Sequence, residues 1–203
     1  MNLYKLFNIC SDCIFPPSST ALIIRNLTED DIRRLYREHT VHDTRALSNY
    51  SEKNTRTLIH EAKFKGNTKA QLLLGILFAT FLEQYKKPLD ILIPIPLSSP
   101  RIRARGYNQV LEILRSVSVH TQIPIISNLL IRDRNTRPQT ELSRDERHQN
   151  LKDAFMVSKP NDVSGKHIIL VDDVVTTGTT LRAAKTALLQ HSPATVTCVA
   201  LAH

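Results

Sequence analysis

The sequence predicts an α/β fold in which a parallel sheet is covered by helices on both faces. Short apolar runs that suit buried strands alternate along the chain with longer segments whose apolar residues recur at helical spacing. Strands and helices that alternate in this way form parallel sheets, because each helix carries the chain back to the edge where the next strand starts. A length of 203 residues accommodates one such domain, and no repeat of roughly 20 to 50 residues is visible.

Three helices are expected before the first strong strand. Thr28 suits a helix N-cap, since three acidic residues follow it directly. The apolar spacing of Leu58–Ala62 indicates a second helix, which ends near Gly66. Thr68 is expected to cap a third helix, whose apolar positions continue to Leu82.

The C-terminal part supplies the predicted strands. Four apolar runs have the length of buried strands: Ile91–Pro96, Ile123–Ile126, Ile168–Val171 and Val196–Leu201. Helical spacing returns at Val110–Val117 and again after Gly178. The residues before about 55 lack this alternation, so we expect residues 1–54 to form a small N-terminal appendage and residues 55–203 to form the main domain.

Charge and composition restrict the partners. The chain has 27 Lys and Arg residues against 19 Asp and Glu residues, which gives a net charge of +8 and favours an anionic partner such as a phosphorylated metabolite, nucleic acid or anionic membrane. An apolar fraction of 41% excludes a fully disordered chain. The longest apolar run, Leu72–Leu82, is too short to span a bilayer, and no signal peptide is evident. We therefore expect a cytoplasmic protein.

The segment Ile168–Thr180 carries the strongest chemical signal. Asp172 and Asp173 follow four apolar residues, at the end of a predicted strand where ligands of open α/β sheets bind. Four threonines around Gly178 then lead into a helix, and the N–H groups of such a turn bind phosphate. Paired carboxylates accept hydrogen bonds from a diol and hold Mg²⁺ through water. The alternative is a turn with ordinary helix caps, but one capping residue would suffice for that.

Arginine is concentrated in the middle of the chain. Nine arginines and no lysine occur between residues 101 and 147, within segments that include Arg101–Gln109 and Arg137–Arg144. The guanidinium group offers a planar fork of donors that suits phosphate and pyrophosphate oxygens. A solvated basic surface is the alternative, although such a surface normally mixes lysine with arginine.

These motifs resemble known families. Ile168–Thr180 resembles the phosphoribosyl pyrophosphate motif of type I phosphoribosyltransferases over all thirteen positions. The order P-x-P, R-G-Y-N-Q, Q-x-x-L-S-x-x-x-R-x-x-N-L and D-D-V-x-T-T-G resembles the ComF/GntX family of competence-associated, phosphoribosyltransferase-like proteins, from about Leu58 to Leu201. The resemblance implies a type I phosphoribosyltransferase-like fold.

The resemblance also implies roles for individual residues. Asp172 and Asp173 would hold the ribose and Mg²⁺. The 5′-phosphate would lie in the turn formed by Thr176, Thr177, Gly178, Thr179 and Thr180. A loop over Ser98–Arg105 would bring arginines towards the pyrophosphate: Arg101, Arg103 and Arg105. The segment Gln139–Asn150 would act as a mobile cover.

One position departs from the purine-salvage relatives. Where Thr176 stands, those relatives often have an aspartate that accepts a proton from the base. A threonine hydroxyl has no useful pKa near neutrality and does not serve as a general base. Salvage of hypoxanthine or guanine is therefore not expected, and no catalytic residue is identified.

The first cysteines form a separate motif. Cys10 and Cys13 have the C-x-x-C spacing of a zinc knuckle, and His39 and His42 are candidates for the missing ligands. Four interpretations remain: a Zn²⁺ site, a degenerate finger without metal, a redox pair and two ordinary thiols. Cys198 is expected to be a buried hydrophobe. The remaining histidines are interpreted as surface or local polar residues: His60, His120, His148, His167, His191 and His203.

Three functions are compatible with this sequence. The first is a protein that binds phosphoribosyl pyrophosphate and works with single-stranded DNA and the competence machinery, with Arg132, Arg134 and Arg137 in an exposed DNA-binding loop. The second is a Mg²⁺-dependent phosphoribosyltransferase with an unknown acceptor. The third is a regulator that senses the nucleotide precursor without turnover. Few aromatic residues and no tryptophan are available for base stacking.

Overall fold

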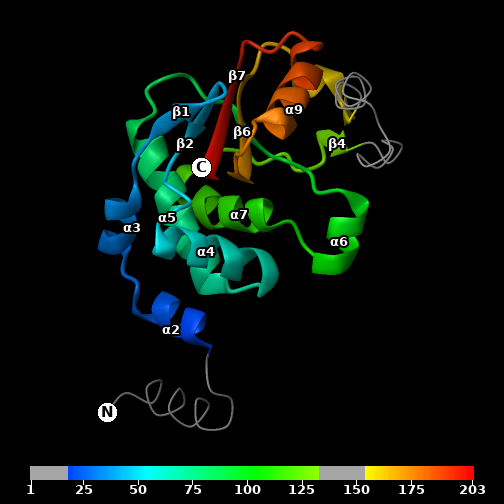
Figure 1. Cartoon of the computed structure of the whole chain (residues 1–203). Coiled ribbons are helices and arrows are strands. Elements are labelled where there is room, and N and C mark those ends of the chain that lie inside the picture. The colour runs from blue at the N-terminus through cyan, green and yellow to red at the C-terminus, as the bar shows by residue number, and fades with distance from the viewer. Residues whose placement is uncertain (1–17, 133–153) are drawn as a thin grey trace.

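A computed structural model describes residues 18–132 and 154–203 (Figure 1). The described residues form a five-stranded sheet in the order β1-β2-β7-β6-β3. Its strands are β1 (His39–Val41), β2 (Thr44–Ala46), β7 (Thr195–Ala202), β6 (His167–Val174) and β3 (Ile91–Pro94). The pairs β2–β7, β7–β6 and β6–β3 are parallel, and only the edge strand β1 is antiparallel. The predicted parallel sheet is confirmed.

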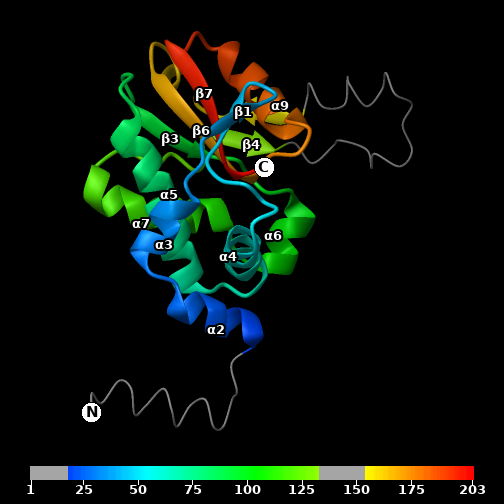
Figure 2. The same cartoon turned by 60° about the vertical axis from the view of Figure 1, so that its left-hand side comes forward.

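Helices cover both faces of this sheet (Figure 1). One face packs against α4 (Lys53–Phe64), α5 (Thr68–Gln84) and α7 (Gln109–Thr121), and the other packs against α9 (Thr179–Leu189) and a two-stranded ribbon of β4 (Leu130–Arg132) and β5 (Phe155–Val157). The remaining elements are α2 (Ser19–Asn26), α3 (Glu29–Leu35), α6 (Ser99–Arg105) and a short 3₁₀ helix, Pro160–Asp162. Figure 2 shows α4 and α6 side by side beneath the strands.

The interior strand β6 divides its side chains between two cores. Ile169 and Val171 join the cluster under α4, α5 and α7. Ile168 and Leu170 join the cluster under α9. Because successive side chains of a strand point to opposite faces, a continuous apolar run indicates a strand that is buried on both sides. This burial fixes the register of β6 and so fixes where its last residues emerge.

Two local predictions are corrected by the structure. Asn67, and not Thr68, caps α5, since the Asn67 side-chain oxygen accepts the N–H of Ala70 at 3.1 Å. The run Ile123–Ile126 forms only an isolated parallel bridge with Leu92, because a single residue pair there meets β3. The predicted cap at Thr28 is confirmed, with a capping box that also uses Asp31.

Residues 18–54, the part of the N-terminal segment that the structure describes, pack as part of the main domain. Strand β2 pairs in parallel with β7, with Thr44 opposite Cys198 and Ala46 opposite Ala200. The side chain of Ile32 in α3 is fully buried in the core. Sheet pairing and core packing thus cross the expected boundary after residue 54.

The thiol of Cys198 is buried in β7, as expected, and burial raises its pKa to about 11. None of the described helices combines the length and the apolar character that a bilayer crossing requires.

Candidate functional site

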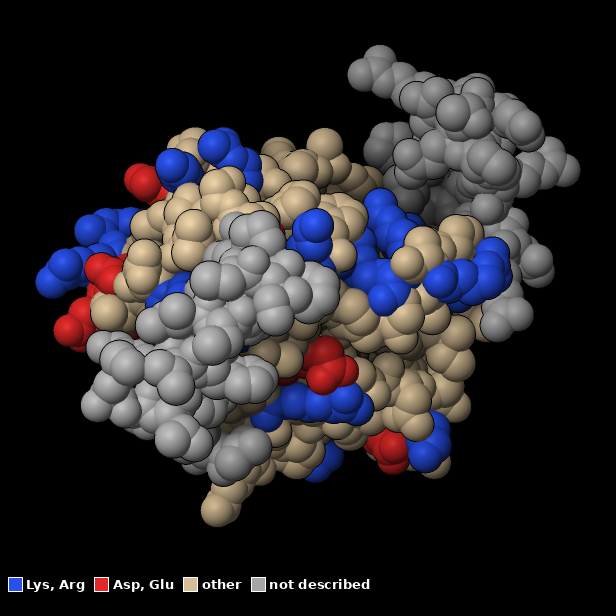
Figure 3. Space-filling view, turned by 90° about the horizontal axis from the view of Figure 1, so that it is seen from below, with Lys and Arg blue, Asp and Glu red and all other residues tan. Residues whose placement is uncertain are grey.

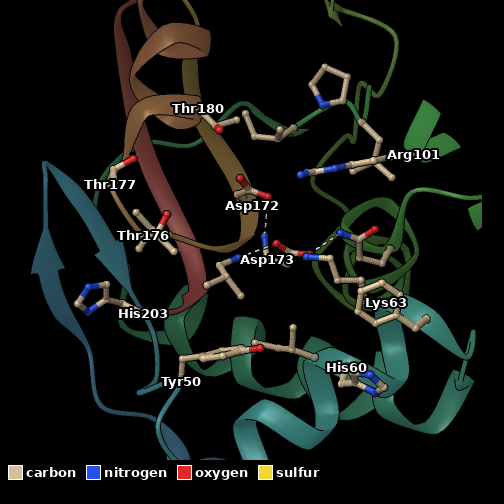
Figure 4. Close-up of a pocket in the computed structure, with 18 of the residues that line it drawn as sticks. Tyr50, His60, Lys63, Arg101, Asp172, Asp173, Thr176, Thr177, Thr180 and His203 are labelled. Carbon is tan, nitrogen blue, oxygen red and sulfur yellow. Dashed lines mark hydrogen bonds and ion pairs between the residues drawn. The ribbon is translucent and has the colours of Figure 1, made fainter. Parts of the chain in front are cut away.

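A cavity of about 790 Å³ opens at the carboxyl ends of β3 and β6 (Figure 4). Its charged lining residues come from three elements, α4, α6 and β6, and from the end of β4: Lys63, Arg101, Asp172, Asp173 and Arg132. Threonines of the turn after β6 line one side of the cavity, and Tyr50 and His60 lie on the opposite side (Figure 4). The carboxyl end of a parallel sheet is where α/β folds bind ligands, because the connecting loops diverge there.

Asp173 is held by donors on both of its carboxylate oxygens. The side chain is buried at the end of β6, and its Oδ1 accepts the N–H of Val174 at 2.8 Å. Its Oδ2 accepts a hydrogen bond from Nε2 of Gln109 in α7. The same oxygen lies 3.1 Å from the ammonium nitrogen of Lys63 in α4. Three elements therefore converge on this single carboxylate.

Asp172 faces the cavity and is less constrained. Its Oδ1 accepts the backbone N–H of Asp173 at 2.8 Å, and its side chain points towards Arg101 (Figure 4). Burial raises the pKa of Asp172 to about 7, and the neighbouring Asp173 charge adds to this rise, against the opposing effects of Lys63 and Arg101. The free protein thus holds a carboxyl group that changes its charge near neutral pH. A cation or a hydroxyl donor beside it would favour the ionised form.

The threonine turn is built as a phosphate-binding turn would be. Gly178 has φ +69° and precedes α9, which no side chain among the described residues caps. The N–H groups of the first turn of α9 are therefore open to a ligand, and they attract anions. A second hollow of about 40 Å³ lies against residues 174–181. The hydroxyl groups of Thr177 and Thr179 are hydrogen-bonded to each other at its edge.

The three expected pyrophosphate arginines do not share one role. Ser98–Arg105 is not a loop, because Ser99–Arg105 forms α6, with Ser98 as its N-cap residue. Arg101 lines the cavity, whereas Arg103 is exposed and does not line it. Arg105 donates a hydrogen bond to Gln109, and its guanidinium lies 5.3 Å from the ring centroid of Phe64. Arg105 thus reaches the site through Gln109.

The R-G-Y-N-Q motif connects the parts of the site. The hydroxyl of Tyr107 donates to the carbonyl of Ala62 at 2.7 Å and so ties the motif to α4. The amide of Asn108 donates to the carbonyl of Ile95 at 2.9 Å, while its oxygen caps α7. Gln109 then donates to the buried aspartate of β6. Each side chain of this segment therefore fixes one element relative to another.

Several residues at the cavity have no signal in the local sequence pattern. Tyr50, Lys63 and His203 line it, although they come from segments far from the β6 motif. His60 and His203 are exposed, as expected of surface residues, but both border the cavity. Arg132 also lines the cavity, so its expected place in a remote exposed loop is wrong. It is the last residue of β4 and lines the same cavity as Asp172 and Asp173.

Other sequence predictions fall outside the described residues. These concern Cys10, Cys13, Arg134, Arg137 and Gln139–Asn150. Zinc binding and a mobile cover therefore stay predictions.

Comparison with known protein families identifies the class to which this fold and cavity belong. Residues 102–203, which make up half of the chain, match the phosphoribosyl transferase domain. The matched part begins in α6 and includes both the R-G-Y-N-Q segment and the whole acid-and-threonine segment. The chain belongs to the phosphoribosyl transferase domain family, and the expected fold class is confirmed.

Curated relatives make the likeness more specific. Over 131 residues, the chain is 38% identical to "Competence protein F" of Haemophilus influenzae, covering 61% of this chain and 57% of that one. It is 36% identical over 145 residues to "DNA utilization protein YhgH" of Escherichia coli O157:H7, covering 68% and 63%. "Competence protein ComFC" of Bacillus subtilis is 29% identical over 153 residues, covering 74% and 59%. The resemblance to ComF-type proteins is confirmed, and the chain spans about three fifths of the length of these relatives.

Solved structures give more distant likenesses. One is a glutamine phosphoribosylpyrophosphate amidotransferase from B. subtilis, with 19% identity and a TM-score of 0.48 over 70% of this chain and 30% of that chain. Another is a hypoxanthine phosphoribosyl transferase from Trypanosoma cruzi, with 17% identity and a TM-score of 0.39 over 72% and 63%.

Proposed function

We propose that the cavity binds phosphoribosyl pyrophosphate with Mg²⁺ and that the protein uses this ligand in the uptake or use of DNA. One observation supports the ligand most strongly: a carboxylate, an open helix N-terminus and an arginine line the same cavity. These groups match a ribose diol, a 5′-phosphate and a pyrophosphate. The volume of about 790 Å³ lies in the range usual for small-molecule sites.

Each part of the ligand has a proposed partner. The 5′-phosphate would accept hydrogen bonds from the turn Thr176–Thr180, where the dipole of α9 also favours negative charge. The ribose hydroxyls would donate to Asp172. The pyrophosphate would lie towards Arg101 and Arg132, which both line the cavity.

The residues present fit a magnesium ion that accompanies the ligand. Mg²⁺ takes oxygen ligands and is usually held in proteins by one or two carboxylates together with substrate phosphates. Asp172 faces the cavity and supplies the carboxylate. When bound, the ion would neutralise charge on the pyrophosphate.

A role in DNA metabolism is supported by the names of the relatives and by charge. Relatives that match most of this chain are named for competence or DNA utilization. The net charge of +8 favours a polyanionic partner. On the face drawn in Figure 3, Lys and Arg side chains form separate groups with Asp and Glu between them. Binding of single-stranded DNA across a salt series tests this part, because phosphate contacts give a steep loss of affinity with salt.

The ligand proposal is tested by calorimetric titration of phosphoribosyl pyrophosphate and Mg²⁺ into the wild-type protein and Asp172→Asn. We expect the substitution to weaken binding at least about tenfold, or about 1.4 kcal/mol. Asp162→Asn is the matched control, since Asp162 is exposed in the 3₁₀ helix and does not line the cavity. Equal affinities for all three proteins would refute the assignment of the pocket.

A second candidate function is phosphoribosyl transfer to an acceptor. It is favoured by the imidazole groups of His60 and His203, which border the cavity beside Tyr50. An imidazole accepts protons near neutral pH and suits a general base, which Thr176 does not. Release of pyrophosphate in the presence of nucleobases tests for turnover. The His60→Gln variant should retain ligand binding but lose this release.

A further inference from the structure

Lys63 lines the cavity and forms an ion pair with Asp173, and the proposed ligand contacts give this lysine no role. Its ammonium nitrogen lies 3.1 Å from Oδ2 of Asp173, and both side chains are largely shielded from solvent. Gln109 donates to the same oxygen, and the N–H of Val174 donates to the other one. Both carboxylate oxygens of Asp173 therefore already accept hydrogen bonds in the ligand-free protein. A metal ion would have to displace Lys63 or Gln109 to bind Oδ2 of this carboxylate.

The net charge of the cavity also opposes a free cation. Among the described residues, three cationic side chains and two carboxylates form its charged lining. Lys63 is paired with Asp173, and the charges of Lys63, Arg101 and Arg132 all interact with Asp172. Each of the three cationic side chains repels a divalent cation twice as strongly as a monovalent one at the same distance. The same three side chains attract a polyphosphate.

We propose that Lys63 is a specificity-determining residue that keeps divalent cations off the aspartate pair until a polyphosphate ligand arrives. In the ligand-free protein Lys63 neutralises Asp173 as an internal cation. The metal then enters only as a complex with the ligand, where Asp172 and the ligand's own oxygens hold it. This last step rests on the proposed function, but exclusion of the free ion does not.

A purely structural role for Lys63 makes a different prediction. In that case the ion pair only fastens α4 to the end of β6, and its loss lowers stability without changing affinity for a free metal ion. The two roles are separated by measuring metal binding in the absence of any organic ligand.

The experiment titrates Mg²⁺ alone into the ligand-free protein by calorimetry. We expect Lys63→Met to bind Mg²⁺ at least about tenfold more tightly than wild type, because the change uncovers Asp173 and removes one positive charge. Lys63→Arg retains the charge and should behave as wild type. Lys65→Met is the matched control, since Lys65 is the C-cap residue of the same helix but is exposed and does not line the cavity. Adding Asp173→Asn to Lys63→Met should abolish the gain.

Circular dichroism and thermal melting establish that each variant is folded, and Lys63→Gln replaces Lys63→Met if the latter is not. The proposal is overturned if wild type binds free Mg²⁺ as tightly as the lysine variant, or if both fail to bind it. Phosphoribosyl pyrophosphate binding is measured separately on wild type. Its absence would remove the proposed function, while a gain of Mg²⁺ affinity in the variant would still support the role of Lys63.

Discussion

His42 fills the space that a side chain on Gly178 would need. A Cβ added to Gly178 would lie 2.8 Å from the Cβ of His42, which is closer than two such carbons approach. His42 lies at the tip of the β1–β2 hairpin, and the adjacent Asp43 forms an ion pair with Lys185 of α9 at 2.6 Å. The hairpin therefore packs against the threonine turn from outside the part of the chain that matches the family.

Gly178→Ala should lower stability more than Gly165→Ala does. Both glycines have φ +69°, so each substitution carries a similar backbone strain of about 1 kcal/mol. Nothing lies within 4 Å of a Cβ at Gly165, whereas a Cβ at Gly178 meets His42. Urea unfolding measures the difference, and adding His42→Gly to Gly178→Ala should recover much of it. Equal losses for the two single variants would show that the contact is unimportant.

The pKa of Asp172 predicts a specific pH dependence of stability. The folded-state pKa of about 7 exceeds the ordinary value of 3.8, so the folded protein binds an extra proton between these pH values. Stability from this group is therefore lost as the pH rises from about 4 to 7. The melting temperature of Asp172→Asn minus that of wild type should increase between about pH 5 and 8. A difference that does not change with pH would contradict the raised pKa of Asp172.

Two arginines of α6 provide a matched pair for pyrophosphate binding. Both are exposed, but Arg101 lines the cavity and Arg103 does not. Arg101→Gln should reduce the affinity for inorganic pyrophosphate about tenfold, because it removes a charged donor from the cavity wall. Arg103→Gln should change the affinity less than about twofold, since Arg103 does not line the cavity and its more distant charge is screened by salt. Equal losses would indicate a general effect of charge and no specific subsite.

Tyr107→Phe should destabilise the protein by about 1 kcal/mol, because it removes a hydrogen bond to a helix carbonyl that is partly shielded from solvent. The Tyr107 hydroxyl fastens the R-G-Y-N-Q segment to Ala62, one residue before Lys63. Urea unfolding measures the loss, with Tyr50→Phe at the cavity wall as the comparison. An unchanged midpoint and slope for Tyr107→Phe would show that this bond does not hold α4 in place.

The sequence predicts the part of the site that is local in the chain. Asp172, Gly178 and the threonines lie within a few residues of one another, so a strand followed by a helix is enough to place them. Lys63 is not predictable in this way, because α4 meets β6 only through packing of the whole layer. The β1–β2 hairpin is missed for a related reason: strands of three residues carry too few positions to show a period.

The arginines that contact the cavity are also not predictable from local sequence, because their positions depend on how separate elements pack. Their number in the middle of the chain indicates an anionic ligand, but helical geometry decides which of them reaches it. In α6, Arg101 and Arg103 point in different directions, since residues at positions i and i+2 lie on different faces of a helix. Arg132 reaches the cavity because β4 ends beside it, which depends on the pairing of β4 with β5.

A crystal structure of the protein with phosphoribosyl pyrophosphate and Mg²⁺ tests the ligand assignment most directly. We expect the 5′-phosphate to accept hydrogen bonds from the backbone of the turn Thr176–Thr180, with the ribose hydroxyls at Asp172. The pyrophosphate should contact Arg101, and Lys63 should remain paired with Asp173. A ligand bound outside this cavity, or one with its pyrophosphate in the threonine turn, would contradict the assignment.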